Sequence, residues 1–362
     1  MSVEDVNAGR IILDYQQELS LPALLESHRT LLAEKPALVS DVEQRSWGQS
    51  VERIYQLANG LIALGIEPGD KVAMLSRNSL VYSELFTAVL LSGAVAVPMQ
   101  TMITDQSLSL MLEDSAAKVL AVSNEFAQMS EFFLANQGQL LPGGLFGFDF
   151  TNERFADLES FRARQGSSAP GIAIDPDWEF NIMYSSGTTG VPKGIVHSHR
   201  TRQGLAKGLM DLGIHSEAKT LITTPLYSNT TFTTWWPTLV AGGTLFIESK
   251  FDAQRSLRLI QQHGISHAMF VPVQYDRIMR EESFSDFDLS SMQVKYCTSA
   301  PLRAALKADV IERFPGELIE FYGLTEGGVG TLFIGSVAKE QNKLGSVGQP
   351  LPGANLKIID DK

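Results

Sequence analysis

The chain has 362 residues, of which 44% are hydrophobic and 19% are charged, and its net charge at pH 7 is −12. This is the composition of an ordinary globular protein, and the length favours two α/β units over one small core. The acidic balance argues against a protein that binds nucleic acid or anionic lipid, because either partner requires a basic surface.

The sequence predicts neither export nor membrane insertion. Residues 1–5 are acidic and lack the apolar run of a signal peptide. The most apolar window, residues 85–99, is short and is interrupted by Gly93 and Pro98, so it predicts a buried helix followed by a strand. Cys297 is the only cysteine, which excludes an internal disulfide. We therefore expect a cytoplasmic protein without integral membrane contact.

Helices and strands alternate through the first part of the chain. Apolar runs of four or five residues predict strands, and the segments between them have the apolar spacing of helices. The expected helices are residues 20–33, 46–64, 79–91 and 105–114, and the expected strands are residues 37–40, 71–75, 94–98 and 118–122. This alternation predicts a largely parallel sheet with helices on both faces.

A surface connection at residues 166–171 separates this part from a second one of the same style. The second part has expected strands at residues 180–184, 195–197, 220–224, 244–247, 268–272, 294–297 and 318–321, with helices at 200–212, 235–240 and 252–263. We predict an α/β fold of two doubly wound, largely parallel subdomains packed together, residues 1–168 and 169–335. Residues 336–362 would begin a β-rich, barrel-like segment.

Residues 184–194 carry the strongest functional signal, because they contain three glycines, four Ser or Thr hydroxyls and Lys193 between two apolar strands. Glycines let backbone N–H groups approach an anion, hydroxyls donate hydrogen bonds, and lysine supplies a cation. A flexible turn is the alternative, but the composition favours phosphate binding. The spacing is not that of the Walker loop, since Pro192 precedes the lysine. The candidate phosphate-binding residues are Ser185, Ser186, Gly187, Thr188, Thr189, Gly190 and Lys193.

Two further segments, residues 298–302 and 322–328, follow apolar strands, where ligands bind in open parallel sheets. If the three strands are neighbours, the three segments face one crevice. Tyr322 offers a flat ring for a purine, Thr325 a hydroxyl for a phosphate, and Glu326 an oxygen ligand for Mg²⁺. Taken singly, they could be a core-edge tyrosine, a helix N-cap and a first-turn carboxylate.

In order and in kind, these segments resemble the signatures of the adenylate-forming superfamily, which includes acyl- and aryl-CoA synthetases, peptide-synthetase adenylation domains and luciferases. The resemblance covers essentially the whole chain, including residues 68–73, 91–98 and 344–350. It implies that ATP activates a small carboxylic acid to an acyl-adenylate with release of pyrophosphate, and that the thiol of CoA then accepts the acyl group. Mg²⁺ is the implied metal, no nucleic acid is implied, and a homodimer is left open.

The resemblance also implies residue roles. Lys193, Thr325 and Glu326 would be catalytic, with Thr325 on the α-phosphate and Glu326 on Mg²⁺. The remaining nucleotide contacts would be Ser299, Ala300, Pro301, Tyr322 and Gly323. The acid would contact Tyr227, Ser228, Asn229, Phe232, Trp235, Gly323 and Gly327. Phe232, Trp235 and Trp236 favour an apolar or aryl acyl group, but both tryptophans can equally be ordinary helix packing. Many members have His at the position of Ser228 and a glycine pair at Thr298-Ser299. Residues 227–234 contain no acidic side chain, which disfavours a free amino acid as substrate.

In the superfamily, a segment like residues 356–362 lies well before the end of the chain. A ribose-binding Asp, a hinge and a small lid domain with a catalytic lysine would follow it. We therefore expect a truncated chain that lacks the lid, binds nucleotide and turns over weakly. Two alternatives remain: an adenylating enzyme with an amine or carrier-protein acceptor, and a catalytically dead nucleotide-binding protein. The histidine pairs 197/199 and 263/267 are interpreted as structural.

Overall fold

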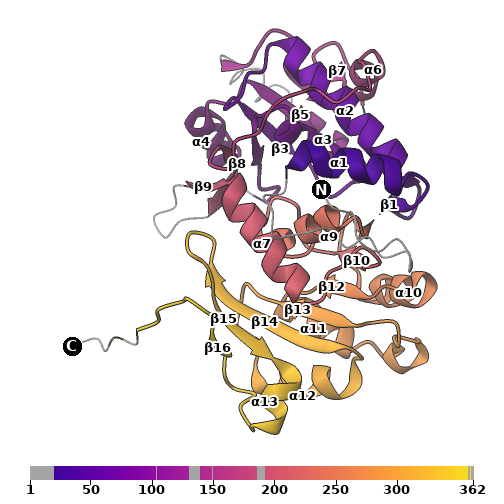
Figure 1. Cartoon of the computed structure of the whole chain (residues 1–362), viewed down its shortest axis with the longest axis vertical. Coiled ribbons are helices and arrows are strands. Elements are labelled where there is room, and N and C mark those ends of the chain that lie inside the picture. Colours follow the sequence, from indigo (N-terminus) through magenta and orange to yellow (C-terminus); the bar gives the residue numbers. More distant parts are fainter. Residues whose placement is uncertain are drawn as a thin grey trace.

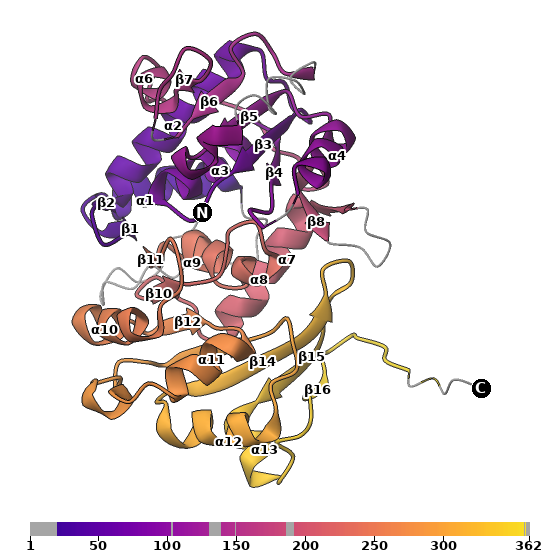
Figure 2. The same cartoon turned by 180° about the vertical axis from the view of Figure 1, so that it is seen from behind.

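The computed structural model describes residues 20–102, 104–129, 139–148, 150–185, 192–357 and 359. In this part of the chain, two largely parallel sheets form two lobes, and helix α7 (His199–Asp211) lies between the lobes (Figure 1). Figure 2 shows the same arrangement from behind, with α8 (Asn229–Phe232) and α9 (Trp235–Ala241) also between the two sheets. The predicted fold class, α/β with two doubly wound and largely parallel sheets, is confirmed.

The first lobe contains a seven-stranded sheet that is parallel except for its last pair, β8 and β9. Its strands, in sheet order, are β7 (Ala156–Asp157), β6 (Leu145–Gly147), β5 (Val119–Val122), β3 (Lys71–Leu75), β4 (Val95–Pro98), β8 (Glu179–Ser185) and β9 (Lys193–Ser198). The helices of this lobe are α1 (Leu21–Leu31), α2 (Trp47–Leu64), α3 (Leu80–Leu91), α4 (Asp105–Ser115) and α6 (Leu158–Ala163), with a 3₁₀ turn at Asn124–Met129. The central strands are apolar throughout because helices cover both faces.

Local sequence fixes the ends of these helices. The side chain of Ser46 accepts a hydrogen bond from the backbone N–H of Gln49, and the Gln49 side chain accepts one from the Ser46 N–H, so α2 begins with a capping box. It ends at Gly65, whose φ of +103° is a conformation that glycine adopts without strain. These signals explain why its expected bounds match the observed ones so closely.

The second lobe contains a nine-stranded sheet, parallel except at its edges. Its strands, in sheet order, are β16 (Gln349–Pro350), β15 (Gly328–Ile334), β14 (Glu317–Leu324), β13 (Val294–Cys297), β12 (His267–Met269), β10 (Lys219–Ile222), β11 (Thr244–Ile247), β1 (Pro36–Val39) and β2 (Gln44–Ser46). Helices α10 (Ala253–His263), α11 (Pro272–Met279) and α12 (Ala304–Arg313) pack on the face opposite α7, with a 3₁₀ turn at Phe284–Asp286.

Two pairs of strands lie in a different sheet from the one that their position in the sequence predicts. Strand β1 pairs in parallel with β11, with Leu38 opposite Leu245, although it precedes the whole first sheet in sequence. Strands β8 and β9 complete the first sheet although they follow residue 168. If the subdomains are defined by their sheets, β1 and β2 belong to the second subdomain, and β8 and β9 belong to the first. The expected boundary between residues 168 and 169 therefore does not separate the two sheets.

The C-terminal segment does not start a barrel within the described residues. After α13 (Gly335–Glu340), strand β16 has two residues and pairs antiparallel with β15 at the edge of the nine-stranded sheet. No closed barrel is present in the part of the chain that the structure describes. The expectation of a barrel-like unit is corrected accordingly: residues 349–350 extend an existing sheet because β15 offers a free edge.

An aromatic cluster joins the lobes. Phe86 of α3 and Phe180 of β8 pack against Phe232 of α8 and Trp235 of α9, with ring centroids 5.2 to 6.2 Å apart. The cluster belongs to a core that also contains α1 and α2. It therefore holds α8 in place beside α7. Among the described helices, none has both the length and the apolar content of a membrane span.

Candidate functional site

A cavity of about 740 Å³ lies between α7 and the hairpin of β14 and β15. The predicted site residues on its wall come from three separate segments of the sequence. The predicted site residues on this wall are Ser228, Asn229, Ser299, Gly323, Thr325, Glu326 and Gly327. The structure thus brings the expected acyl-binding segment and two of the three expected nucleotide-binding segments to one space.

The rim at residues 298–302 is tied to its neighbours on both sides. Strands β13 and β14 are adjacent, and the Thr298 hydroxyl donates to the Phe321 carbonyl at 2.9 Å. The hydroxyl of Ser299 is hydrogen-bonded to that of Thr230 at the start of α8. Ser299 has a φ of +80°, a region that L-residues rarely occupy. Ser299, Ala300 and Pro301 are exposed, so this rim is accessible to a ligand.

The segment after Phe321 is a hairpin, whereas the sequence favoured a loop. Strand β14 continues through Tyr322 and Gly323, and residues 325–327 form the turn into β15. A Cβ on Gly323 would lie 2.1 Å from the Gly328 carbonyl oxygen, so the strands meet too closely for any other residue. Thr325 therefore does not cap a helix. Thr325 lies at the turn and lines the cavity.

Tyr322 is 57% exposed and lies on the opposite face of β14 from Phe321, which lines the cavity. An exposed aromatic ring can stack on a planar ligand. Its expected role, stacking on adenine, stays a prediction.

The two strands expected at the ends of residues 184–194 are present as β8 and β9, which pair antiparallel with Ser185 opposite Lys193. Ser186, Gly187, Thr188, Thr189 and Gly190 lie outside the described residues. Lys193 is exposed at the first position of β9. These strands belong to the first sheet, so the three segments do not follow neighbouring strands of one sheet, as the sequence argument assumed. Instead, His197 of β9 contacts the turn between β14 and β15, at the carbonyl oxygen of Thr325.

Arg202 was not predicted, and it is the centre of a buried polar cluster at one end of the cavity. Its Nε donates to Asn181 Oδ1 at 2.9 Å and its Nη1 to Asn229 Oδ1 at 2.7 Å. Its Nη2 donates to Nδ1 of His197 at 3.2 Å. The guanidinium also lies 4.4 Å from the ring centroid of Phe232. Arg202 is 2% exposed yet lines the cavity.

His197 connects this cluster to the hairpin turn. Its Nε2 lies 2.8 Å from the Thr325 carbonyl oxygen, so Nε2 carries the proton and Nδ1 is free to accept from Arg202. Burial, assisted by the charge of Arg202, lowers the pKa of His197 to about 4. Burial also lowers the pKa of Arg202 to about 9, which leaves it charged at neutral pH. The sequence interpretation of His197 as structural is incomplete, because its ring touches the candidate site.

The other end of the cavity is apolar. Ser198 is the N-cap of helix α7, and its hydroxyl accepts a hydrogen bond from the N–H of Thr201. One stripe of small and apolar residues of this helix lines the cavity. The stripe consists of Gly204, Leu205, Gly208, Leu209 and Leu212. A Cβ at either glycine would meet no atom within 4 Å, so this floor is open. Leu209 lies about 10 Å along the helix from Arg202.

The expected acid-binding residues divide into two groups. Ser228 and Asn229 line the cavity, whereas Phe232 and Trp235 are fully buried one layer behind it. The Trp235 indole N–H donates to the Ser83 hydroxyl at 2.8 Å, which fits the packing alternative. The Tyr227 hydroxyl accepts a hydrogen bond from Thr101 at 3.4 Å and so lies toward the first lobe.

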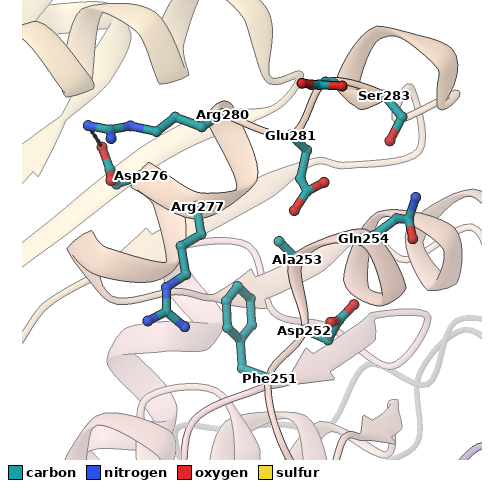
Figure 3. Close-up of a pocket in the computed structure, with 10 residues that line it drawn as sticks. Phe251, Asp252, Ala253, Gln254, Asp276, Arg277, Arg280, Glu281 and Ser283 are labelled. Atoms are coloured by element: carbon teal, nitrogen blue, oxygen red, sulfur yellow. Dashed lines mark ion pairs between the residues drawn. The ribbon is translucent and has the colours of Figure 1, made fainter.

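A second hollow, of about 640 Å³, lies between the start of α10 and the end of α11 (Figure 3). Charged side chains of both signs surround it, including the ion pair of Asp276 and Arg280 at 2.8 Å. None of the predicted site residues lines it. In the described part of the chain, no group of three or more His, Cys, Asp or Glu is placed to hold a metal ion.

Comparison with known proteins agrees with this geometry. A family model described as AMP-binding enzyme matches residues 26–362. The chain is 29% identical over 307 residues to a feruloyl-CoA synthase of Amycolatopsis sp, covering 84% of this chain and 59% of the relative. It is 30% identical over 307 residues to the long-chain-fatty-acid–CoA ligase FadD13 of Mycobacterium tuberculosis, with the same two coverages. It is 28% identical over 335 residues to ScoC of Streptomyces coeruleorubidus, a fatty acid–[acyl-carrier-protein] ligase, covering 90% of this chain and 62% of the relative.

Solved structures give the same result. The inhibitor-bound N-terminal domain of FACL13 from Mycobacterium tuberculosis superposes with a TM-score of 0.83 at 26% identity, covering 92% of this chain and 82% of that one. The anthranilate CoA ligase AuaEII, in complex with anthranoyl-AMP, has a TM-score of 0.84 at 23% identity, covering 96% of this chain and 68% of that one. The chain thus corresponds to the N-terminal domain of a solved relative and spans 59% to 62% of the length of the curated relatives above.

Proposed function

Since the chain belongs to the family of AMP-binding enzymes, we propose that it activates a carboxylic acid by transferring the AMP group of ATP to the carboxylate. A carboxylate oxygen attacks the α-phosphorus, the bond from that phosphorus to the β-phosphate bridging oxygen breaks, and pyrophosphate leaves. The observation that carries this proposal is one cavity wall that joins the turn at Thr325 and Glu326 to the apolar floor of α7. Such a wall can hold an anionic reaction centre and an apolar acyl group together.

The main obstacle in this reaction is repulsion between the carboxylate and the triphosphate. Positioned donors and cations lower it. We assign the α-phosphate to the Thr325 hydroxyl, the triphosphate to Lys193 and the segment 185–190, and the purine to Tyr322 and the rim at residues 299–301. No enzyme nucleophile is required.

Glu326 fits the role of a Mg²⁺ ligand. It is exposed on the cavity wall at the hairpin turn, and proteins commonly hold Mg²⁺ with one or two carboxylates together with substrate phosphates and water. When bound, the ion supplies positive charge to the phosphates.

The open stripe of α7 favours an apolar acyl or aryl group. In the whole protein we propose the thiol of CoA as acceptor, because feruloyl-CoA synthase and FadD13 are named for that product. A carrier-protein thiol is the second candidate, favoured by the similarity to ScoC. We propose a cytoplasmic location because the chain has one cysteine, Cys297, and it is buried. We propose that these 362 residues alone turn over slowly, because they span only 59% to 62% of the length of the curated relatives. A homodimer is also a proposal, and light scattering would test it.

Calorimetric titration of the chain with ATP·Mg²⁺ tests the nucleotide site. Thr325→Val should weaken binding about tenfold, because it removes one hydrogen bond to a charged phosphate. Glu326→Gln should raise the Mg²⁺ concentration needed for binding. Glu281→Gln, in the second hollow, is the control and should bind as the unaltered chain does. If the unaltered chain fails to bind ATP·Mg²⁺, the proposed function is wrong.

The acid and the acceptor need separate measurements. Incubation with ATP·Mg²⁺ and a mixed pool of apolar and aryl acids should yield an acyl-adenylate that mass spectrometry identifies. ATP binding without any adenylate would instead support a catalytically dead nucleotide-binding protein. Offering CoA, a carrier protein and an amine to the full-length protein would then distinguish the acceptors.

A further inference from the structure

We propose that Arg202 binds a carboxylate of the acid substrate at the polar end of the cavity, and that His197 positions this arginine relative to Thr325. The inference rests on the proposed function and deepens it by naming the residue that receives the substrate's negative charge. It comes from the hydrogen bonds of Arg202, its charge and its place on the cavity wall.

The hydrogen bonds of Arg202 leave part of its guanidinium unused. A guanidinium has five N–H groups, and three of them are donated to Asn181, Asn229 and His197. In the described part of the chain, one N–H on each terminal nitrogen has no acceptor. Two N–H groups on adjacent nitrogens match the two oxygens of a carboxylate.

The charge of Arg202 is also uncompensated within the described residues. Two of its acceptors are amide oxygens, and the third is the neutral Nδ1 of His197. Nearly buried ions are ordinarily paired, because an isolated charge is costly to remove from water. Partly buried Arg53 follows that rule, because it contacts Glu84 and Glu159. Arg202 lines a cavity instead, so a ligand in that cavity can supply the negative charge that pairs with it.

The placement of Arg202 suits the substrate acid better than the nucleotide. Along α7 it is followed by the open apolar stripe of Gly204, Gly208 and Leu209, which would hold an acyl group. Through His197 it is fixed to the Thr325 carbonyl at the turn assigned to the α-phosphate. A carboxylate on Arg202 would thus lie between the acyl floor and the phosphate.

Two carboxylates could occupy this place: the one that becomes adenylated, or the second carboxylate of a dicarboxylic acid. Matched acids distinguish them. Calorimetry would measure the affinity of octanoate against suberate, and of benzoate against terephthalate, for the chain saturated with Mg²⁺ and a non-hydrolysable ATP analogue. The same titrations would be run on Arg202→Met, Arg202→Lys and a control, Arg200→Met. Arg200 is two positions away, exposed, and paired with Asp177 at 2.7 Å.

We expect Arg202→Met to weaken acid binding at least tenfold while the affinity for the ATP analogue stays within twofold. Arg202→Lys should recover part of the loss, since it keeps the charge without the fork, and Arg200→Met should behave as the unaltered chain. If the affinity falls for all four acids, Arg202 binds the carboxylate that becomes adenylated. If it falls for suberate and terephthalate alone, Arg202 binds the second carboxylate of a dicarboxylic acid. Either result supports the proposal.

Asn229→Asp provides a test that does not remove the arginine. It places an internal carboxylate at the position now 2.7 Å from Nη1, and it should raise the melting temperature while weakening acid binding at least tenfold. The proposal is overturned if the unaltered chain binds the ATP analogue but none of the acids, or if Arg202→Met or Asn229→Asp binds them as tightly as the unaltered chain. Failure to bind the ATP analogue at all would refute the proposed function itself.

Discussion

At the scale of single residues, the site depends on two positions that sequence reasoning treated incompletely. Ser299 was expected at the nucleotide site because of its segment, but its left-handed backbone, with φ of +80°, cannot be read from the sequence. Arg202 carried a signal that was overlooked. It lies at helical spacing from Leu205 and Leu209, so a charge interrupts the apolar face of α7. Its lack of a carboxylate partner needed the structure.

The strain at Ser299 gives a stability prediction. Glycine adopts this φ freely, whereas a β-branched side chain does not. We expect Ser299→Val to lower the free energy of unfolding by about 1–3 kcal/mol relative to Ser299→Gly. Urea denaturation of both variants measures the difference. Both lose the hydrogen bond to Thr230, which makes the pair a matched comparison. Equal stability would show that the rim is unstrained.

At the scale of elements, helix and strand positions followed closely from apolar spacing and caps. The expected helices at residues 46–64 and 252–263 are observed as α2 and α10, with Ser46 and Asp252 as their N-caps. What the sequence could not supply is pairing. Tyr322–Leu324 looked like a loop because Gly323 and Gly327 break the apolar pattern, yet it pairs with β15 and forms a hairpin. Strand pairing depends on the partner strand as well as on the residues of the segment itself.

Helix α7 gives a prediction at this scale. Gly204 and Gly208 reduce its helical stability, and neither would meet an atom as alanine. We expect Gly208→Ala to raise the free energy of unfolding by about 0.5–1 kcal/mol. Gly208→Phe should fill the cavity and abolish acid binding while ATP binding remains. The control is Lys207→Phe, one position along the helix and outside the cavity wall. Acid binding that survives Gly208→Phe would place the acyl group elsewhere.

At the scale of the whole molecule, the lobes exchange strands and share one aromatic core, so the site between them is set by the fold as a unit. The sequence predicted two α/β units correctly, because alternating elements are a local pattern. It could not predict that β8 and β9 close the first sheet, since that requires contacts with β4 across a long connection. As a result the strands that flank the predicted phosphate-binding segment were expected in the wrong sheet, and the role of that segment stays a prediction.

Buried histidines give the molecule a predicted pH dependence. Burial lowers the pKa of His28, His197, His199 and His267 from 6.5 to about 4. Between pH 6.5 and 4 the unfolded chain therefore binds more protons, so the stability present above pH 6.5 is lost as the pH falls. Each histidine can contribute up to about 1.4 kcal/mol per pH unit. Burial raises the pKa of Glu248 to about 7 and also raises the pKa of Glu84, so two carboxyl groups oppose this trend against four histidines.

Urea midpoints at pH 7.5, 6.5 and 5.5 measure this dependence. We expect little change between pH 7.5 and 6.5 and a clear fall at pH 5.5. His267→Gln should show a smaller fall, because one proton fewer is taken up on unfolding. A midpoint that stays constant or rises at pH 5.5 would mean that these histidines are not held neutral by the fold.

The most direct test of the whole account is a crystal structure of the chain with a non-hydrolysable acyl-adenylate analogue. We predict adenosine against Tyr322 and the rim at residues 299–301, the linkage between Thr325 and Arg202, and the acyl group over Gly204 and Gly208. An analogue bound in the hollow between α10 and α11, with the cavity beside α7 empty, would contradict the account.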